Sequence, residues 1–271
     1  MTHLTEISNT FEALWPAAGA ELWDAPGFVT SHSDAVTGVL LSVDITGAVL
    51  AEARAKGCNL VLAHHPFLLK GTQEVNHDSL KGSVLTFALK HSIAIFAAHT
   101  NADIVENGVS DVIAKKLGLT NIKPLVKTAD SEGHGRIGRL AQAIPLQEFA
   151  AQVAETLPFS ARGVTVAGDP EHLIETVALC GGAGDSFIEA AHASDADVYV
   201  TSDLRHHPTL DATLTPREKP LALVDVSHWA AESLWLEIAA TAIANAHPGV
   251  AVHVSEVVTD PWVFSINRGE R

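Results

Sequence analysis

Short apolar runs alternate with longer alanine-rich segments along most of the chain. Six of the runs are too short for helices and predict buried strands, namely Val39–Val43, Leu60–Ala63, Ile93–Ala97, Val177–Cys180, Val198–Val200 and Leu221–Val224. The segments between them predict helices at Thr46–Lys56, Gly82–His91, Val109–Leu117, Ser186–Ala193 and Ala231–Ala244. This alternation predicts an α/β fold with a largely parallel, covered sheet.

The pattern of apolar and polar positions repeats within the chain. Gly38–Pro66 and Thr176–Pro208 both read as strand, helix, strand and then a polar cluster, and each leads on to another apolar run followed by a histidine. Residues able to bind a metal recur 129 positions apart, as His99 and Asp103 in the first repeat and as His228 and Glu232 in the second. Such a repeat indicates duplication, with both halves facing one cleft.

A polar, glycine-rich stretch divides the two repeats. Lys127–Arg139 reads KTADSEGHGRIGR, a composition typical of a loop. We therefore expect a first α/β half at residues 1–126 and a second at residues 127–271, both boundaries being approximate.

Two adjacent histidines stand where a predicted buried strand ends. His64 and His65 follow Val61-Leu62-Ala63, and Pro66 prevents the strand from continuing. In parallel α/β sheets, ligands bind beyond the carboxyl ends of strands. Consecutive side chains leave an extended chain on opposite sides, so this pair would serve two neighbouring ions better than it would chelate one.

Three further side chains complete a set of metal ligands. His228 and Glu232 are four residues apart at the start of a predicted helix, which places them on one helix face. Asp103 adds a second carboxylate after the strand that ends at Ala97. Mixed histidine and carboxylate ligands suit Zn, Mn, Fe or Co. Five ligands exceed the needs of one open tetrahedral site and predict two ions about 3.5–4 Å apart.

Each of these elements also has an ordinary structural interpretation. A histidine at a strand end is commonly just a hydrogen-bonded polar residue, and a carboxylate in the first turn of a helix is favoured by the helix dipole. Metal binding is favoured because the residues stand together at strand ends in a duplicated pattern.

Other polar residues near these strand ends have two interpretations each. His99 would suit a partner of a ligand or a proton shuttle, or it shapes the loop. Asp203 and Asp44 would orient a ligand histidine, or they cap a helix. The glycines Gly181, Gly182 and Gly184 form a tight turn or a phosphate cradle.

Net charge, hydropathy and cysteine content argue against several classes of function. The net charge of −15 argues against extended contact with nucleic acid or an anionic membrane, because phosphate binding needs clustered Lys and Arg. The first residues lack the features of a signal peptide, and no apolar stretch reaches the roughly 20 residues that span a bilayer. The two cysteines provide no disulfide framework, so we expect a cytoplasmic protein.

At these residues the sequence resembles the GTP cyclohydrolase 1 type 2 homologue family, the NGG-interacting-factor-like proteins. The resemblance spans nearly the whole chain and rests on AHHPFLLKG, HTNAD with GVSDVIAKKLGL, VALCGGAGDSFIEAA, DVYVTSDLRHH, DVSHWAAE and TDPWVF. It implies two similar, intertwined three-layer α/β halves with a dinuclear metal site in the cleft between them. By position, the metal ligands it implies are His64, His65, Asp103, His228 and Glu232, with Glu232 as the bridge.

The resemblance also implies a ring-like homohexamer and a small-molecule substrate such as a nucleotide. Ala25-Pro26 and Ser202 depart from the family's usual Trp-Asp-Asn-x-Gly-Leu and Thr-Gly-Asp patterns, and Ser227 stands where the family has Gly before its last histidine ligand. These departures put substrate contacts near Ala25 and Ser202 in doubt and remove no ligand.

Two functions follow as hypotheses. The first is a dinuclear metal-dependent hydrolase that acts on a nucleotide or a phosphorylated small molecule, with two divalent ions activating water. This suits a chain without a Ser/His/Asp or Cys/His arrangement. The alternative is a non-catalytic metal-handling or regulatory protein. Convergent polar residues such as Thr100, Asn101 and Thr201 favour the enzyme.

Overall fold

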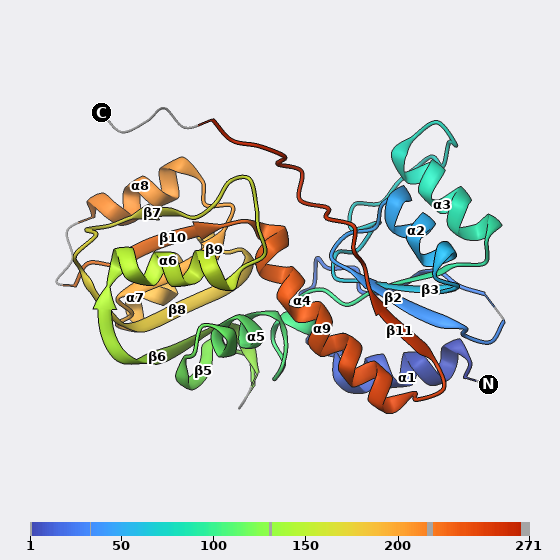
Figure 1. Cartoon of the computed structure of the whole chain (residues 1–271), viewed down its shortest axis with the longest axis horizontal. Coiled ribbons are helices and arrows are strands. Elements are labelled where there is room, and N and C mark those ends of the chain that lie inside the picture. Colours follow the sequence, from blue (N-terminus) through green and yellow to red (C-terminus); the bar gives the residue numbers. More distant parts are fainter. Residues whose placement is uncertain (1, 33, 130–131, 216–218, 267–271) are drawn as a thin grey trace. The chain divides into compact units, whose positions relative to one another are not determined.

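The chain contains two sheets, each within its own compact unit. The computed structural model describes residues 2–32, 34–129, 132–215 and 219–266. One unit comprises Met1–Ala102 with Trp235–Thr259, and the other comprises Asp103–Leu234 with Asp260–Arg271 (Figure 1). The expected α/β class is therefore confirmed.

The first unit contains a mostly parallel sheet. Its strands lie in the order β1-β4-β3-β2-β11, with bounds Gly27–Thr30, Ala94–Ala97, Leu60–Ala63, Gly38–Ser42 and Ala251–Val254. The four strands from β4 to β11 are parallel, and only the edge strand β1 is antiparallel to its neighbour. The three strands expected in this half agree with β2, β3 and β4 to within one residue at each end.

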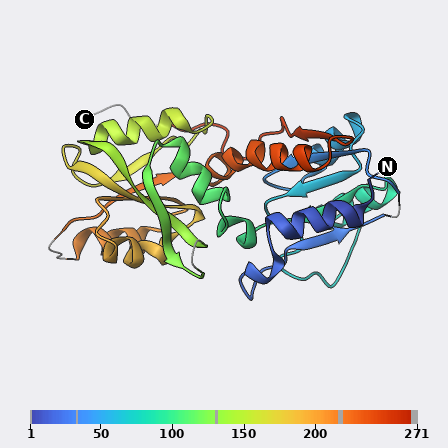
Figure 2. The ribbon, with the colours of Figure 1, turned by 90° about the horizontal axis from the view of Figure 1, so that it is seen from below.

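Helices cover both faces of the first sheet. Helices α2 (Gly47–Ala55) and α3 (Leu80–Lys90) bury Val49 and Val84 in one apolar cluster with the sheet residues Leu40 and Val61. The opposite face carries α1 (Leu4–Leu14), whose Phe11 ring lies 4.8 Å from the ring of Phe96 (Figure 2). The ring centroid of Trp15, which follows α1, lies 5.2 Å from that of Trp235 in α9 (His228–Ala246). The first unit is thus a three-layer sandwich.

The sheet of the second unit is mixed. Its order is β5-β6-β8-β9-β10-β7, with bounds Thr120–Lys127, Gly133–Pro145, Leu173–Ala183, Val198–Ser202, Ala222–Val226 and Thr165–Ala167. Strands β8, β9 and β10 are parallel, whereas β5, β6 and β7 pair antiparallel with their neighbours. The expectation of a largely parallel sheet holds for the first unit only. Successive antiparallel strands such as β5 and β6 need no helical crossover, which removes the alternation that predicts parallel strands.

Helices also cover both faces of the second sheet. On one face, Ile188 and Ala191 of α7 (Ile188–Ala193) pack with Tyr199 and Leu223. On the other, Ile113 of α5 and Val153 of α6 lie against the sheet. The remaining helical bounds are Val109–Lys116 for α5, Leu146–Thr156 for α6, His206–Leu214 for α8, Thr100–Asp103 for α4, Ala17–Gly19 for η1 and Asp185–Phe187 for η2.

The predicted repeat is found again in the strand order of the two units. The series β2-β3-β4 and β8-β9-β10 each form three adjacent parallel strands, as the duplication predicts. The chain changes unit at Ala102–Asp103, at Leu234–Trp235 within α9 and at Thr259–Asp260, so the two compact units alternate along the sequence. The stretch expected as a connection belongs to the β5–β6 hairpin, apart from residues 130 and 131, which lie outside the described residues.

No helix among the described residues is both long and apolar enough to cross a membrane.

Candidate metal centre

His64 and His65 directly follow the last residue of strand β3, and their backbones extend its pairing with the neighbouring segment. The backbone N–H of His64 donates to the carbonyl of Ser42 at 3.0 Å, and that of His65 donates to Val43 at 2.9 Å. These two bonds tie the histidine pair to the end of β2. The position of both side chains is therefore set by the parallel register of β2 and β3, not by a mobile loop.

The imidazoles of His64, His65 and His99 are each oriented through their Nδ1 atom. His64 Nδ1 lies 2.9 Å from the carbonyl oxygen of Ala98, which can only accept. Nδ1 therefore carries the proton, and Nε2 holds the lone pair that can bind a metal. His65 Nδ1 pairs with Asp44 Oδ1 and His99 Nδ1 pairs with Asp24 Oδ1, each at 2.8 Å. Such outer partners are what orient metal-ligating histidines in proteins.

The three imidazoles form a compact cluster. One ligand atom from each of His64, His65 and His99 lies within 4.8 Å of the others. His64 is fully buried, and its ring centroid is 5.1 Å from that of His65 and 5.2 Å from that of His99. The adjacent histidines diverge less than the extended-chain pattern predicts, because β3 has already ended at Ala63.

Asp24 anchors the cluster from a distant part of the sequence. Its carboxylate accepts from His99 Nδ1, from the backbone N–H of Thr100 and from the Thr100 hydroxyl. Burial by itself raises the pKa of Asp24, but the hydrogen bonds from His99 and Thr100 outweigh burial and lower the pKa from 3.8 to about 2. Asp24 is therefore a carboxylate at neutral pH, and it supports a proton on the Nδ1 atom of His99.

The second unit carries its own pair of ligand atoms. His228 is the first residue of α9, and its Nε2 lies 2.8 Å from Glu232 Oε1, the i,i+4 geometry expected from the sequence. Its Nδ1 lies 2.7 Å from Asp203 Oδ2. The hydrogen bond from His228 lowers the pKa of Asp203, which burial only partly opposes. Asp203 thus contacts the histidine, while Arg205 occupies the N-cap position of α8.

Gly182 leaves room for this pair. Its φ is +73°, and a Cβ built at this position would lie 2.8 Å from Glu232 Oε1 and 3.5 Å from His228 Nε2. A side chain at position 182 would therefore displace the Glu232 carboxylate. A glycine at this position therefore keeps the Glu232 carboxylate and the His228 imidazole in their observed places.

Asp103 is the first residue of the second unit, which also contains His228 and Glu232. Burial raises the pKa of Cys180 to about 12, and the charges of Asp103 and Glu232 add to that rise.

The five expected ligands thus fall into two groups by unit. His64 and His65 lie with His99 in the first unit, and Asp103 lies with His228 and Glu232 in the second. Neutral imidazole nitrogens and carboxylate oxygens are a donor set that fits Zn, Mn, Fe or Co. The sequence did not identify Asp24, because a partner 75 positions upstream of His99 leaves no spacing signal.

Comparisons with known proteins agree over the whole chain. The family model described as Duf34/NIF3 (NGG1p interacting factor 3) matches residues 2–261. A Streptomyces coelicolor protein named GTP cyclohydrolase 1 type 2 homolog is 43% identical over 275 residues, covering 98% of this chain and 95% of its own length. A Mycobacterium tuberculosis protein of the same name is 29% identical, covering 96% of each chain.

Solved structures show the same fold. A hypothetical protein from Staphylococcus aureus superposes with a TM-score of 0.89 at 26% identity, covering 97% of this chain and 99% of that one. A Bacillus cereus protein related to NIF3 superposes with a TM-score of 0.88 at 23% identity, with the same coverage.

Proposed function

The chain belongs to the Duf34/NIF3 family, and from this membership we propose that it binds two divalent metal ions through His64, His65, Asp103, His228 and Glu232. The observation that carries the proposal is the shared anchoring of the histidines. His64, His65 and His228 each engage a carbonyl or a carboxylate through Nδ1, which supports metal binding through Nε2.

The ions would serve hydrolysis of a nucleotide or of a phosphorylated small molecule. Divalent ions in such a site supply Lewis acidity, which activates water and polarises a phosphoryl or carbonyl oxygen. The chain's own residues would bind the ions and orient the ligand side chains. Asp44 and Asp203 hold the rings of His65 and His228 in place, and Glu232 offers a carboxylate that is 2% exposed.

Charge supports a substrate that binds through the ions. The chain has a net charge of −15, so an anionic substrate gains little attraction from the protein as a whole. Bound cations reverse the sign of the field at the site itself. We therefore expect substrate binding to require metal.

Metal handling without catalysis is the alternative function. The side chains of His65 and His228 are 27% and 29% exposed, which would allow ions to exchange with a partner. Turnover separates the two functions. Metal-loaded protein that hydrolyses GTP, another nucleotide or a model phosphodiester is an enzyme. Metal-loaded protein that hydrolyses none of them but passes its ions quickly to an apo-acceptor is a carrier.

Association into a homo-oligomer, a hexamer by family resemblance, is part of the same proposal. The apolar side chains of Trp262, Val263 and Phe264 are 57–80% exposed, and large exposed apolar residues in one segment favour association. Light scattering of the full chain measures the number of copies.

Metal content tests the binding proposal directly. The full chain, stripped with a chelator and reloaded with Zn, Mn, Co or Fe, should retain about two ions per chain in elemental analysis. His64→Gln and His228→Gln should each lower the retained amount. His77→Gln is the control, because the His77 side chain is 82% exposed. Retention unchanged in both ligand variants would refute the assignment.

A further inference from the structure

Helix α8 meets its sheet with a polar face. His206, Thr209, Leu210 and Thr213 are spaced as i, i+3, i+4 and i+7, so they share one side of the helix. A helix on a sheet normally presents apolar residues there, yet three of these four are polar. None of the nine residues of α8, all of which the structure describes, is buried. Ala212 packs against the apolar cluster that contains Leu223, and the four residues named above border a space beside that contact.

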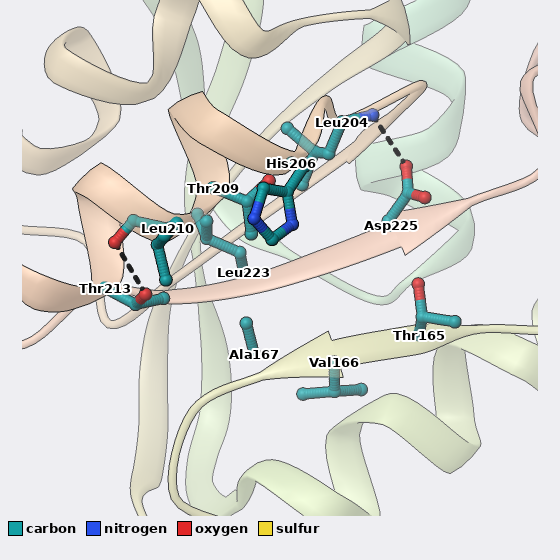
Figure 3. Close-up of a pocket in the computed structure, with 10 residues that line it drawn as sticks. All are labelled: Thr165, Val166, Ala167, Leu204, His206, Thr209, Leu210, Thr213, Leu223 and Asp225. Carbon is teal, nitrogen blue, oxygen red and sulfur yellow. Dashed lines mark hydrogen bonds between the residues drawn. The ribbon is translucent and has the colours of Figure 1, made fainter.

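That space is a cavity of about 320 Å³ in the second unit (Figure 3). Its floor comes from the antiparallel pair β10 and β7, in which Leu223 lies opposite Ala167 and Asp225 lies opposite Thr165. Directly opposed residues point to the same face of a sheet, so these four side chains line one surface. The volume lies at the lower end of the range for small-molecule pockets, about 300–1,000 Å³.

Three of the polar side chains that line the cavity present hydrogen-bond acceptors to it, while His206 and Thr165 can also donate. The hydroxyls of Thr209 and Thr213 donate to the carbonyls of Arg205 and Leu210, so they present lone pairs to the cavity. Asp225 adds a carboxylate whose side chain is 11% exposed. Among the residues lining this cavity, none is lysine or arginine. The wall therefore disfavours phosphate and other anions and favours ligands that donate N–H groups.

The apolar part of the lining restricts the shape of the ligand. Leu223 and Ala167 lie on the sheet side, and Leu210 lies on the helix side. Apolar side chains on both sides of the space favour the faces of a flat, ring-shaped ligand. We propose that the cavity between α8 and the β10–β7 pair binds an amino-substituted nitrogen heterocycle of nucleobase size, with Asp225, Thr209 and Thr213 accepting its N–H groups.

This pocket is independent of the metal proposal, although the two are linked through side chains. Asp225 Oδ2 accepts from Arg162 Nη2 at 2.9 Å, and Arg162 Nη1 lies 3.7 Å from Asp203 Oδ1. Asp203 in turn accepts from His228. A ligand that engages Asp225 thus acts on the group that orients His228, but its binding requires no ion.

Adenosine and cytidine are suitable probes, with purine riboside as the matched ligand that lacks the exocyclic amino group. Binding is measured on chelator-treated full chain by saturation-transfer NMR and titration calorimetry. Thr209→Val should weaken adenosine binding roughly three- to tenfold, the loss of one hydrogen bond. Ala167→Phe should abolish it by filling the floor. Thr241→Val is the matched control, since Thr241 on exposed α9 surface also donates its hydroxyl to the carbonyl four residues before it.

The outcomes divide clearly. Adenosine binding that weakens in Thr209→Val, holds in Thr241→Val and exceeds binding of purine riboside supports the proposal. Absence of binding for both nucleosides at millimolar concentration overturns it, as does equal binding of purine riboside. A change of oligomeric state in Ala167→Phe with adenosine binding intact would assign the face to a second copy of the chain and would also overturn it. None of these outcomes decides whether the chain binds metal, because binding is measured on chelator-treated protein.

Discussion

Gly182 and Glu232 approach so closely that a Cβ at position 182 would lie 2.8 Å from Glu232 Oε1. They are 50 positions apart in the sequence, at the end of β8 and in the second turn of α9. Position 182 therefore needs glycine for two reasons. Its φ is +73°, and the Glu232 carboxylate lies beside it. The two reasons can be separated by substitution.

Gly182→Ala should displace the Glu232 carboxylate and reduce metal retention. Backbone strain at positive φ adds a loss of about 1 kcal/mol in unfolding free energy. Gly163→Ala is the control, because Gly163 also has a positive φ of +64° but no atom within 4 Å of its built Cβ. Elemental analysis and urea unfolding should show a similar stability loss in both variants and metal loss in Gly182→Ala alone. Equal metal retention would remove Glu232 from the ligand set.

Asp203→Asn should weaken metal binding while leaving the fold intact. The neutral amide accepts less strongly from His228 Nδ1 and no longer supports the imidazole as the carboxylate does. Loss of such a partner lowers metal affinity roughly 10- to 100-fold. Competition with a fluorescent chelator measures the affinity. Asp185→Asn removes a carboxylate that pairs with Arg205 and should leave the affinity unchanged. Equal affinities in both variants would show that His228 needs no such partner.

The duplication was visible in the sequence, but the roles of the repeated positions were not. Leu60 pairs with Val39 in the first sheet as Val198 pairs with Val177 in the second. Counted from these residues, His65 and Asp203 occupy equivalent positions. One is a candidate ligand and the other orients a ligand, so a shared backbone position carries different chemistry in the two units.

The spacing between the two repeats that the histidines suggest differs by one residue from the spacing that the strand pairing gives. Ala94 pairs with Leu60 and Ala222 pairs with Val198, so Ser227, not His228, takes the position of His99 in the strand register. The 129-residue offset came from matching one histidine with another. The register of the structure is set instead by hydrogen bonds between neighbouring strands. Sequence comparison cannot detect such a slip, because both offsets place a histidine near the strand end.

The antiparallel part of the second sheet was missed for a different reason. Strand β5 contains no fully buried residue, and its sequence TNIKPLVK has neither an apolar run nor clean alternation. Its partner β6 contains the glycine-rich segment from Gly133 to Arg139. Gly133 needs its small size, because a Cβ there would lie 2.1 Å from the carbonyl of Val126. Glycines that permit close strand approach look like loop residues in a sequence.

Acid should unfold the metal-free protein partly through Asp24. Its pKa in the folded state is about 2, below the ordinary value of 3.8, so folding favours the charged form. The resulting stability is present above pH 4 and is lost as the pH falls through the range from 4 to 2, by about 2 kcal/mol in total. Urea unfolding of chelator-treated protein at several pH values measures this loss.

Asp24→Asn should show a shallower loss than the unsubstituted chain over the same pH range, because it cannot be protonated. Asp211→Asn, on exposed α8 surface, should follow the unsubstituted chain. Parallel pH curves for all three proteins would mean that the Asp24 carboxylate contributes no such stability.

Arg136 should prove essential to the segment that follows Asp103. Its guanidinium is 2% exposed and donates to Asp111, to the carbonyls of Ile104 and Val105 and to two carbonyls of the hairpin. Lysine cannot reproduce this planar set of donors. Arg136→Lys should therefore lower the unfolding free energy by about 3 kcal/mol, the range for disrupting a buried ion pair.

Arg139→Lys is the matched control, because Arg139 pairs with Glu175 at a site where its side chain is 52% exposed. It should leave the free energy of unfolding nearly unchanged, because an exposed ion pair contributes little. If Asp103 contributes a metal ligand, Arg136→Lys should also lower metal retention under conditions where the protein remains folded by circular dichroism. Full retention in folded Arg136→Lys would show that the Ile104–Val105 contacts do not hold Asp103 in place.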